Sequence, residues 1–103
     1  VIVEDAIALE KAGAFAIVLE VVPAELAARV RDAVNIPIVG IGAGTEADAQ
    51  VLVWHDLLGF TSAHQAKFVK HYAELHKEAT SAVSAWARDV ESGAYPDADH
   101  EYH

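Results

Sequence analysis

The chain has 103 residues and a mass of 11.0 kDa, so it is one small domain or a piece of a larger one. Apolar residues make up 53% and charged residues 22%, which excludes disorder as the default state. A formal charge of −9 argues against binding to nucleic acids or anionic membranes, and the lack of cysteine excludes disulfides and thiolate sites.

The first half of the chain predicts alternating helices and strands. The spacing of apolar residues predicts a helix over Ile2–Ala12, with Gly13 as its stop signal. Phe15–Leu19 is an unbroken apolar run, which indicates a strand buried on both faces. Pro23 suits the first turn of a second helix. The apolar stripe of that helix is Leu26, Val30 and Val34.

A second buried strand is predicted over Ile36–Ile41, where the glycines that follow break the run into a loop. Thr45 is expected to cap a short helical turn. Val51–Trp54 is a third apolar run and is interpreted as a strand. Strands joined by helical connections indicate parallel β/α units, an α/β fold.

The last forty-odd residues change character. Two helices are predicted, and a polar tail follows from Asp97 to His103. The first helix is marked by Ala63, Ala66, Val69, Tyr72 and Ala73, and the second by Ala79, Val83, Trp86, Ala87 and Val90. We therefore assign residues 1–60 to β/α units and 61–103 to C-terminal helices and tail of the same domain.

Three parallel strands cannot close a barrel. The strand at Phe15–Leu19 would have an open edge with unpaired backbone groups, so we expect the isolated chain to associate or partly unfold. This edge, together with the absence of any methionine, suggests a truncated or processed chain. Acidic residues near the N-terminus do not suit a secretory leader, and a cytoplasmic protein is expected.

Glu20 directly follows the first predicted strand. In parallel β/α folds the carboxyl ends of the strands face the active site, where a partly desolvated carboxylate can act as a general base or acid. An acid at the start of the next helix, near Pro23, would instead stabilise the helix dipole. Position alone leaves both interpretations open.

Two other strand ends carry polar or flexible residues. The glycines of the Gly40–Gly44 loop let backbone N–H groups approach an anion, or simply form a tight corner. His55 and Asp56 could bind a ligand, although an ordinary polar strand end is favoured. The remaining histidines lack metal-site spacing and are interpreted as surface residues: His64, His71, His76, His100 and His103.

Together these segments resemble the ketopantoate hydroxymethyltransferase family. Val18–Ala27 resembles its V-L-E-x-V-P-x-E-L-A segment, and Ile36–Gly44 resembles I-P-x-I/V-G-I-G-A-G. Asp48–Asp56 resembles D-G-Q-V-L-V-x-H-D. The similarity continues, in the same order, through Lys67–Lys70, Tyr72, Val90–Pro96 and the tail Asp99–Tyr102.

The resemblance implies a (β/α)8 barrel of the phosphoenolpyruvate/pyruvate superfamily, of which this chain would be about strands six to eight plus the C-terminal helices. It implies hydroxymethyl transfer from 5,10-methylenetetrahydrofolate to 3-methyl-2-oxobutanoate, giving 2-dehydropantoate. A Mg²⁺ ion would polarise the keto group, and Glu20 matches the catalytic proton acceptor. The resemblance also implies a homo-oligomer, since the enzymes of this family are decamers.

The family's metal and substrate ligands lie on earlier strands, so none is carried over to this chain, which alone should be inactive. Val21 and Ala49 stand where the family more often has Cys and Gly. Two alternatives remain: another barrel of the superfamily acting on a different oxo acid, or a non-catalytic half-barrel scaffold. An upstream coding sequence with the missing strand ends would exclude the scaffold.

Overall fold

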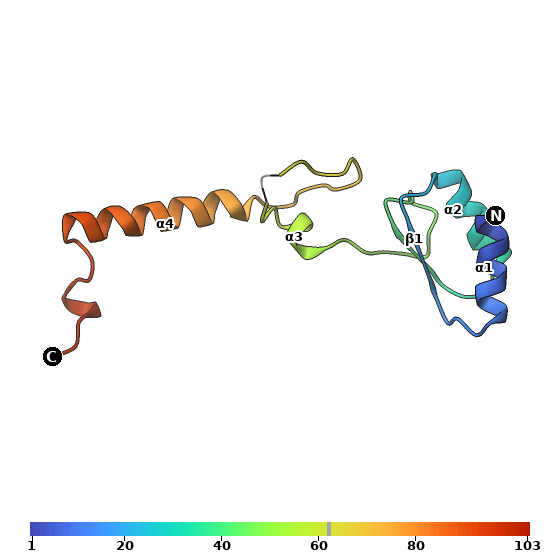
Figure 1. Cartoon of the computed structure of the whole chain (residues 1–103), viewed down its shortest axis with the longest axis horizontal. Helices are drawn as coiled ribbons and strands as arrows, with labels where there is room; N and C mark the ends of the chain where they lie inside the picture. Colours follow the sequence, from blue (N-terminus) through green and yellow to red (C-terminus); the bar gives the residue numbers. More distant parts are fainter. Residues whose placement is uncertain (62) are drawn as a thin grey trace. The chain divides into compact units, whose positions relative to one another are not determined.

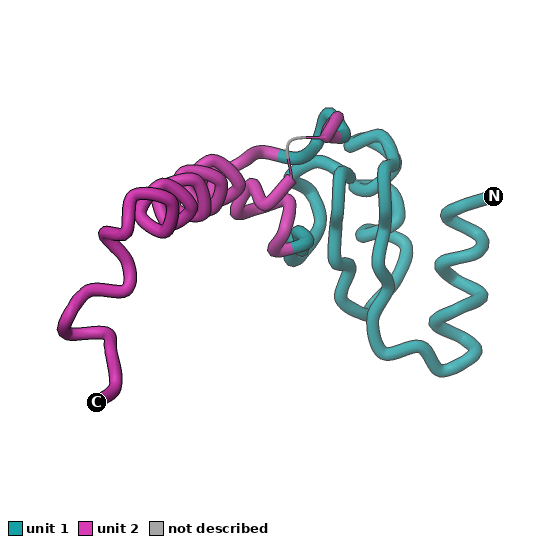
Figure 2. Tube along the Cα trace, turned by 60° about the vertical axis from the view of Figure 1, so that its left-hand side comes forward, with its two compact units in different colours: residues 1–53, 66–69 teal, residues 54–65, 70–103 magenta. Residues whose placement is uncertain are grey.

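The computed structural model describes residues 1–61 and 63–103, which fall into two compact units (Figure 2). Unit 1 comprises Val1–Val53 and Ala66–Val69, and unit 2 comprises Trp54–Gln65 and Lys70–His103. The elements are α1 (Ile2–Lys11), β1 (Ile17–Glu20), α2 (Ala24–Ala33), β2 (Ile38–Ile41), β3 (Ala49–Gln50), α3 (Trp54–Leu57), α4 (Leu75–Ser92) and the 3₁₀ turn η1 (Ala98–His100). Figure 1 labels the four α-helices and β1.

Unit 1 is a small parallel sheet with two helices beside it (Figure 1). The strand order is β1-β2-β3, and the register pairs Ile17 with Ile38 and Glu20 with Ile41. The two helices predicted from Ile2 and from Pro23 and the first two strands are confirmed, although each strand begins two residues later than its apolar run. The mixed α/β class is therefore confirmed.

One core holds this unit together, and it lies between the helices and one face of the sheet. Ile38 and Val30 are fully buried, and Ala27 packs with them from α2. Ala6 is the contribution of α1 to the same cluster. Because Val30 belongs to the predicted apolar stripe, the spacing of that helix identifies its core-facing side.

The prediction that the first strand is buried on both faces is wrong. Ile17 and Leu19 are buried in the core, whereas Val18 is 61% exposed and Phe15 is 89% exposed. The helices cover one face of the sheet, so alternate side chains of β1 have no cover among the described residues. The open edge is confirmed, since β2 is the only strand that pairs with β1 among the residues that the structure describes.

The region after β2 also differs from the prediction. Residues 45–48 are not helical, and the third strand is Ala49–Gln50 rather than Val51–Trp54. The Asp48 carboxylate instead accepts a hydrogen bond from the Ile38 N–H at 2.8 Å, and Glu46 forms an ion pair with Arg31. These long-range contacts compete with the local turn, and they bring Ala49 into register with Val39.

Unit 2 contains α3 and the long helix α4. The predicted helix α4 is confirmed and ends at Gly93, which adopts a left-handed conformation with φ +77°. No residue of α4 is buried. No helix in the described ranges is both long and apolar enough to cross a membrane.

The predicted helix over residues 63–73 is wrong, because all of these residues are described and none of them is helical. The chain here makes backbone hydrogen bonds to the end of α3 instead: the Tyr72 N–H donates to the Leu57 carbonyl at 2.8 Å. The His76 N–H donates to the Gly59 carbonyl at 2.9 Å. In the tail, Asp97 caps the η1 turn by accepting from the Asp99 N–H.

Candidate functional site

Glu20 is the last residue of β1, at the carboxyl end of the sheet, as the sequence predicts. Successive residues of β1 point to opposite faces of the sheet, and Ile17 and Leu19 face the core. Glu20 therefore lies on the other face, with Val18, away from the helices. The side chain is exposed within the described residues, so this unit does not itself desolvate the carboxylate.

The backbone turns sharply immediately after this carboxylate. Val21 has φ +52°, a left-handed conformation that is a genuine outlier for a β-branched residue. Its N–H donates to the Ile41 carbonyl at 2.9 Å, which fixes the turn against β2. Such strain costs of order 1–3 kcal/mol and persists only where surrounding contacts hold it. The turn thereby fixes where β1 ends and where Glu20 is placed.

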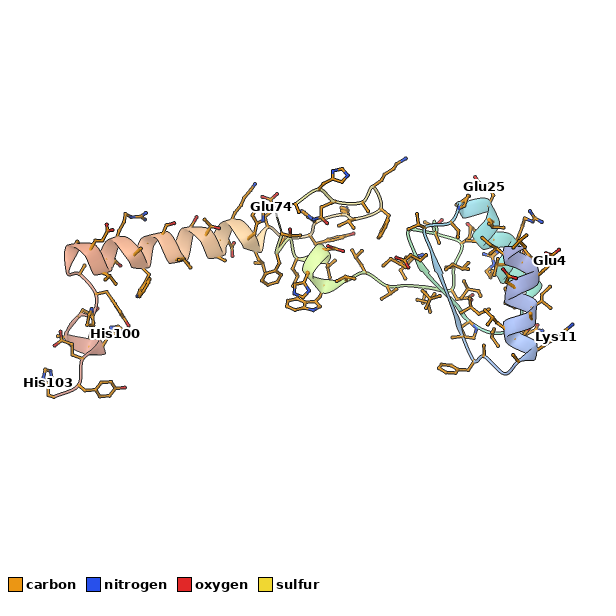
Figure 3. All side chains as sticks on the ribbon, in the orientation of Figure 1. Glu4, Lys11, Glu25, Glu74, His100 and His103 are labelled. Atoms are coloured by element: carbon orange, nitrogen blue, oxygen red, sulfur yellow. The ribbon has the colours of Figure 1, made fainter. Side chains whose placement is uncertain are left out.

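The alternative role for Glu20, stabilising the helix dipole, gains no support from α2. This helix begins after Pro23, and no side chain in the described part of the chain caps it. The acid in its first turn is Glu25, which Figure 3 labels at the start of the helix. Glu25 therefore occupies the position where a carboxylate interacts best with the helix dipole.

The glycine loop after β2 is tightly packed. A Cβ atom on Gly42 would lie 2.8 Å from the Phe68 ring, and one on Gly44 would lie 2.4 Å from the Ala24 Cβ. Both glycines also have positive φ angles, +66° and +78°. Glycine is thus required at both positions by the backbone and by packing.

A pocket of about 570 Å³ opens beside this loop. It is lined by Val21, Gly42, Gly44, Ala66, Lys67 and Phe68, all of them in unit 1. Val21 adjoins Glu20, so the pocket lies at the same carboxyl end of the strands. Sequence reasoning missed Lys67 and Phe68 as site residues because it assigned them to a helix. The local sequence carries no signal that residues 66–69 return to unit 1.

The other strand-end candidates lie in unit 2. His55 and Asp56 belong to α3 rather than to a strand end. The His55 ring packs against Trp54, with centroids 3.9 Å apart, and against Phe60 at 5.7 Å. His55 therefore belongs to a small aromatic cluster.

The remaining histidines divide into two groups. His64, His100 and His103 are exposed, as predicted. The surface prediction is wrong for His76, whose half-buried ring contacts the Gly59 carbonyl through Nδ1 at 2.9 Å. It is also wrong for His71, whose Nε2 is buried without a partner in the part of the chain that the structure describes.

No metal centre is formed by these residues. Within residues 1–61 and 63–103, no three or more His, Asp or Glu side chains are grouped as a metal ion requires. The residues present thus do not fit a Mg²⁺ site. The clearest electrostatic effects are at surface ion pairs: hydrogen bonds from Lys77 lower the pKa of Glu74, and those to Glu46 and Asp32 raise the pKa of Arg31.

Comparison with known proteins shows strong similarity along the chain. The profile of the ketopantoate hydroxymethyltransferase family matches residues 1–98. The 3-methyl-2-oxobutanoate hydroxymethyltransferase of Acidothermus cellulolyticus is 57% identical over 99 residues, which are 96% of this chain and 36% of that protein. The protein of the same name from Streptomyces coelicolor is 54% identical, over 99% of this chain and 35% of its own length. The chain therefore spans about a third of the length of these relatives.

Proposed function

The chain belongs to the ketopantoate hydroxymethyltransferase family, and from this premise we propose that it is the C-terminal part of a 3-methyl-2-oxobutanoate hydroxymethyltransferase. The complete enzyme transfers a hydroxymethyl group from 5,10-methylenetetrahydrofolate to 3-methyl-2-oxobutanoate. Its substrates are small molecules, and it works as a cytoplasmic homo-oligomer. Identity of 57% along nearly the whole chain supports the assignment.

We propose that β1, β2 and β3 are strands six to eight of a (β/α)8 barrel. The parallel pairing of these strands supports this assignment. The bare sheet face at Val18 and the open edge of β1 also fit, because a closed barrel would cover both. The Mg²⁺ of the family finds no ligand set among the described residues, so its ligands are proposed to lie on other segments of the enzyme.

Glu20 is the proposed proton acceptor. The observation that carries this proposal is its position at the carboxyl end of β1, on the face away from the helices and next to the pocket at Val21. The C3–H bond of the oxo acid is adjacent to a ketone, so its electron pair can pass into an enolate when the proton leaves. The Glu20 carboxylate takes that proton, and C3 is then the nucleophile that attacks the one-carbon unit. As the new carbon–carbon bond forms, the carbon–nitrogen bonds of the methylene bridge break, water supplies the hydroxyl oxygen, and tetrahydrofolate leaves.

Exchange of the C3 proton with solvent, followed by NMR, tests this role apart from the folate chemistry. In the complete enzyme, Glu20→Gln keeps the side-chain size but removes the base. Exchange and kcat should both fall by about 10²–10⁴-fold, the usual contribution of general base catalysis. Glu25→Gln, in the first turn of α2, is the matched control and should change little. Exchange at the wild-type rate in Glu20→Gln would show that Glu20 is not the base.

The chain by itself should show no turnover with the oxo acid, Mg²⁺ and methylenetetrahydrofolate, since it forms no metal site among its described residues. Turnover well above background by the purified chain would contradict its assignment as one part of the active site.

A further inference from the structure

The pocket beside the glycine loop is larger than the proposed oxo acid requires. Its volume of about 570 Å³ falls within the range of roughly 300–1,000 Å³ that holds drug-sized ligands and cofactors. The oxo acid has only about eight non-hydrogen atoms and would leave most of this space empty. This volume is large enough to admit a ring of the larger of the two proposed substrates, the folate.

The lining has a chemistry that suits a flat anionic molecule. Phe68 supplies an aromatic ring, and Val21 and Ala66 supply further apolar surface. Rings of this kind pack against heteroaromatic ligands by stacking or by edge contacts. Gly42 and Gly44 add backbone without side chains, which allows a ligand to approach closely.

Lys67 is the basic residue of this lining, and its side chain is exposed. Among residues 1–61 and 63–103 it forms no ion pair, unlike Arg31 and Lys77. The chain as a whole carries a formal charge of −9 and so repels anions. An unneutralised ammonium group at the pocket offsets that repulsion locally and can pair with a carboxylate.

We propose that this pocket binds the folate co-substrate, with an aromatic ring of the folate against Phe68 and a glutamyl carboxylate paired with Lys67. The inference rests on the proposed function, since it assigns a site to one of the two substrates of that reaction. It places the one-carbon donor beside Val21, next to the residue proposed to take the C3 proton.

The test uses steady-state kinetics of the complete enzyme. Lys67→Met keeps an apolar stem but removes the charge, and should raise KM for methylenetetrahydrofolate about tenfold, the size of one charge-assisted contact at an open site. The KM for the oxo acid and the rate of C3 proton exchange should stay the same. Lys70→Met is the matched control, because Lys70 lies over the Tyr72 ring in unit 2 and should leave both KM values unchanged.

A second substrate identifies the carboxylate. The primary amide of methylenetetrahydropteroic acid lacks the glutamyl group and carries no carboxylate, so Lys67→Met should not change its KM. An equal loss with both donors, or a rise in KM for the oxo acid, would overturn the pairing with a glutamyl carboxylate.

Ala66→Trp tests the pocket itself, because an indole there would fill the space while residue 66 keeps its backbone contact to Val69. The value of kcat/KM for the folate should fall at least about tenfold, with C3 proton exchange intact. An unchanged kcat/KM would refute the pocket as the folate site. Absence of exchange and turnover in the unmodified complete enzyme would instead refute the proposed function.

Discussion

Helices α2 and α4 carry apolar stripes of similar spacing, yet only one stripe is covered. In unit 1, Val30 of α2 is fully buried against the sheet. In unit 2, Val83 and Trp86 of α4 are 64% and 55% exposed. Burying one such side chain is worth about 1.5–3 kcal/mol, so the two helices gain very different support from their surroundings. The apolar spacing of a helix identifies the side that needs a cover, and the tertiary structure decides whether this chain supplies it.

Removing core volume should show the largest difference between the units. Ile38→Ala creates a cavity at a fully buried site and should lower the free energy of unfolding of unit 1 by about 3 kcal/mol. Val83→Ala, at an exposed site, should change the stability of unit 2 by less than about 0.5 kcal/mol. Urea unfolding followed by the amide NMR signals of β2 and α4 separates the two units.

Both tryptophans, Trp54 and Trp86, lie in unit 2, so tryptophan fluorescence reports that unit alone. Equal losses from Ile38→Ala and Val83→Ala would mean that α4 is packed as tightly as the core of unit 1, against the exposure of its apolar side chains.

Two glycines with the same backbone conformation sharpen the comparison. Gly44 in unit 1 and Gly93 in unit 2 have φ +78° and +77°. A Cβ at Gly44 would lie 2.4 Å from the Ala24 Cβ, whereas a Cβ at Gly93 would have nothing within 4 Å. Gly93→Ala should cost only the left-handed strain, about 1 kcal/mol, and Gly44→Ala should cost at least about 2 kcal/mol because overpacking adds to it.

Thermal unfolding of the two variants, read from the same amide signals, checks this expectation. A cost for Gly44→Ala no larger than that for Gly93→Ala would show that the glycine loop can move away from α2 without penalty.

The sequence predicts best where local spacing and tertiary packing agree. Apolar spacing identified α1, α2 and α4, and the position of Glu20 followed from the strand that precedes it. Two predictions failed where distant contacts decide the structure: Asp48 binds the start of β2, and residues 72–76 pair with the end of α3. The pocket was missed for the same reason, since Phe68 reaches Gly42 through a return of the chain that no local pattern indicates.

Carboxylates that bind backbone N–H groups offer a smaller contrast. Asp48 accepts from the Ile38 N–H at 2.8 Å in a partly buried bond, and Asp97 accepts from the Asp99 N–H at 3.1 Å in an exposed one. Asp48→Ala should destabilise unit 1 by about 1.5 kcal/mol, because the partly buried Ile38 N–H loses its charged hydrogen-bond acceptor. Asp97→Ala should cost about 0.5 kcal/mol, the low end for a capping residue. Amide exchange rates of Ile38 and Asp99 measure the two losses, and a larger effect at Asp99 would reverse the comparison.

The smallest expected effect is the pH dependence of α4. Hydrogen bonding and charge attraction from Lys77 lower the pKa of Glu74 from its ordinary value of 4.5. Glu74 directly precedes the helix, as labelled in Figure 3, where a negative charge also favours the helix dipole. A carboxylate whose pKa is lowered on folding stabilises the fold above its unfolded pKa, and this contribution is lost as the pH falls through the lower, folded value. Helicity of α4 should therefore decrease slightly below about pH 4.5.

Circular dichroism of the wild-type chain and of Glu74→Gln, compared over this acidic range, isolates the contribution of Glu74. The variant lacks the titrating group, so the two curves should converge at low pH and differ near neutrality. Added salt should reduce the difference, because the pair is exposed to solvent and its attraction is screened.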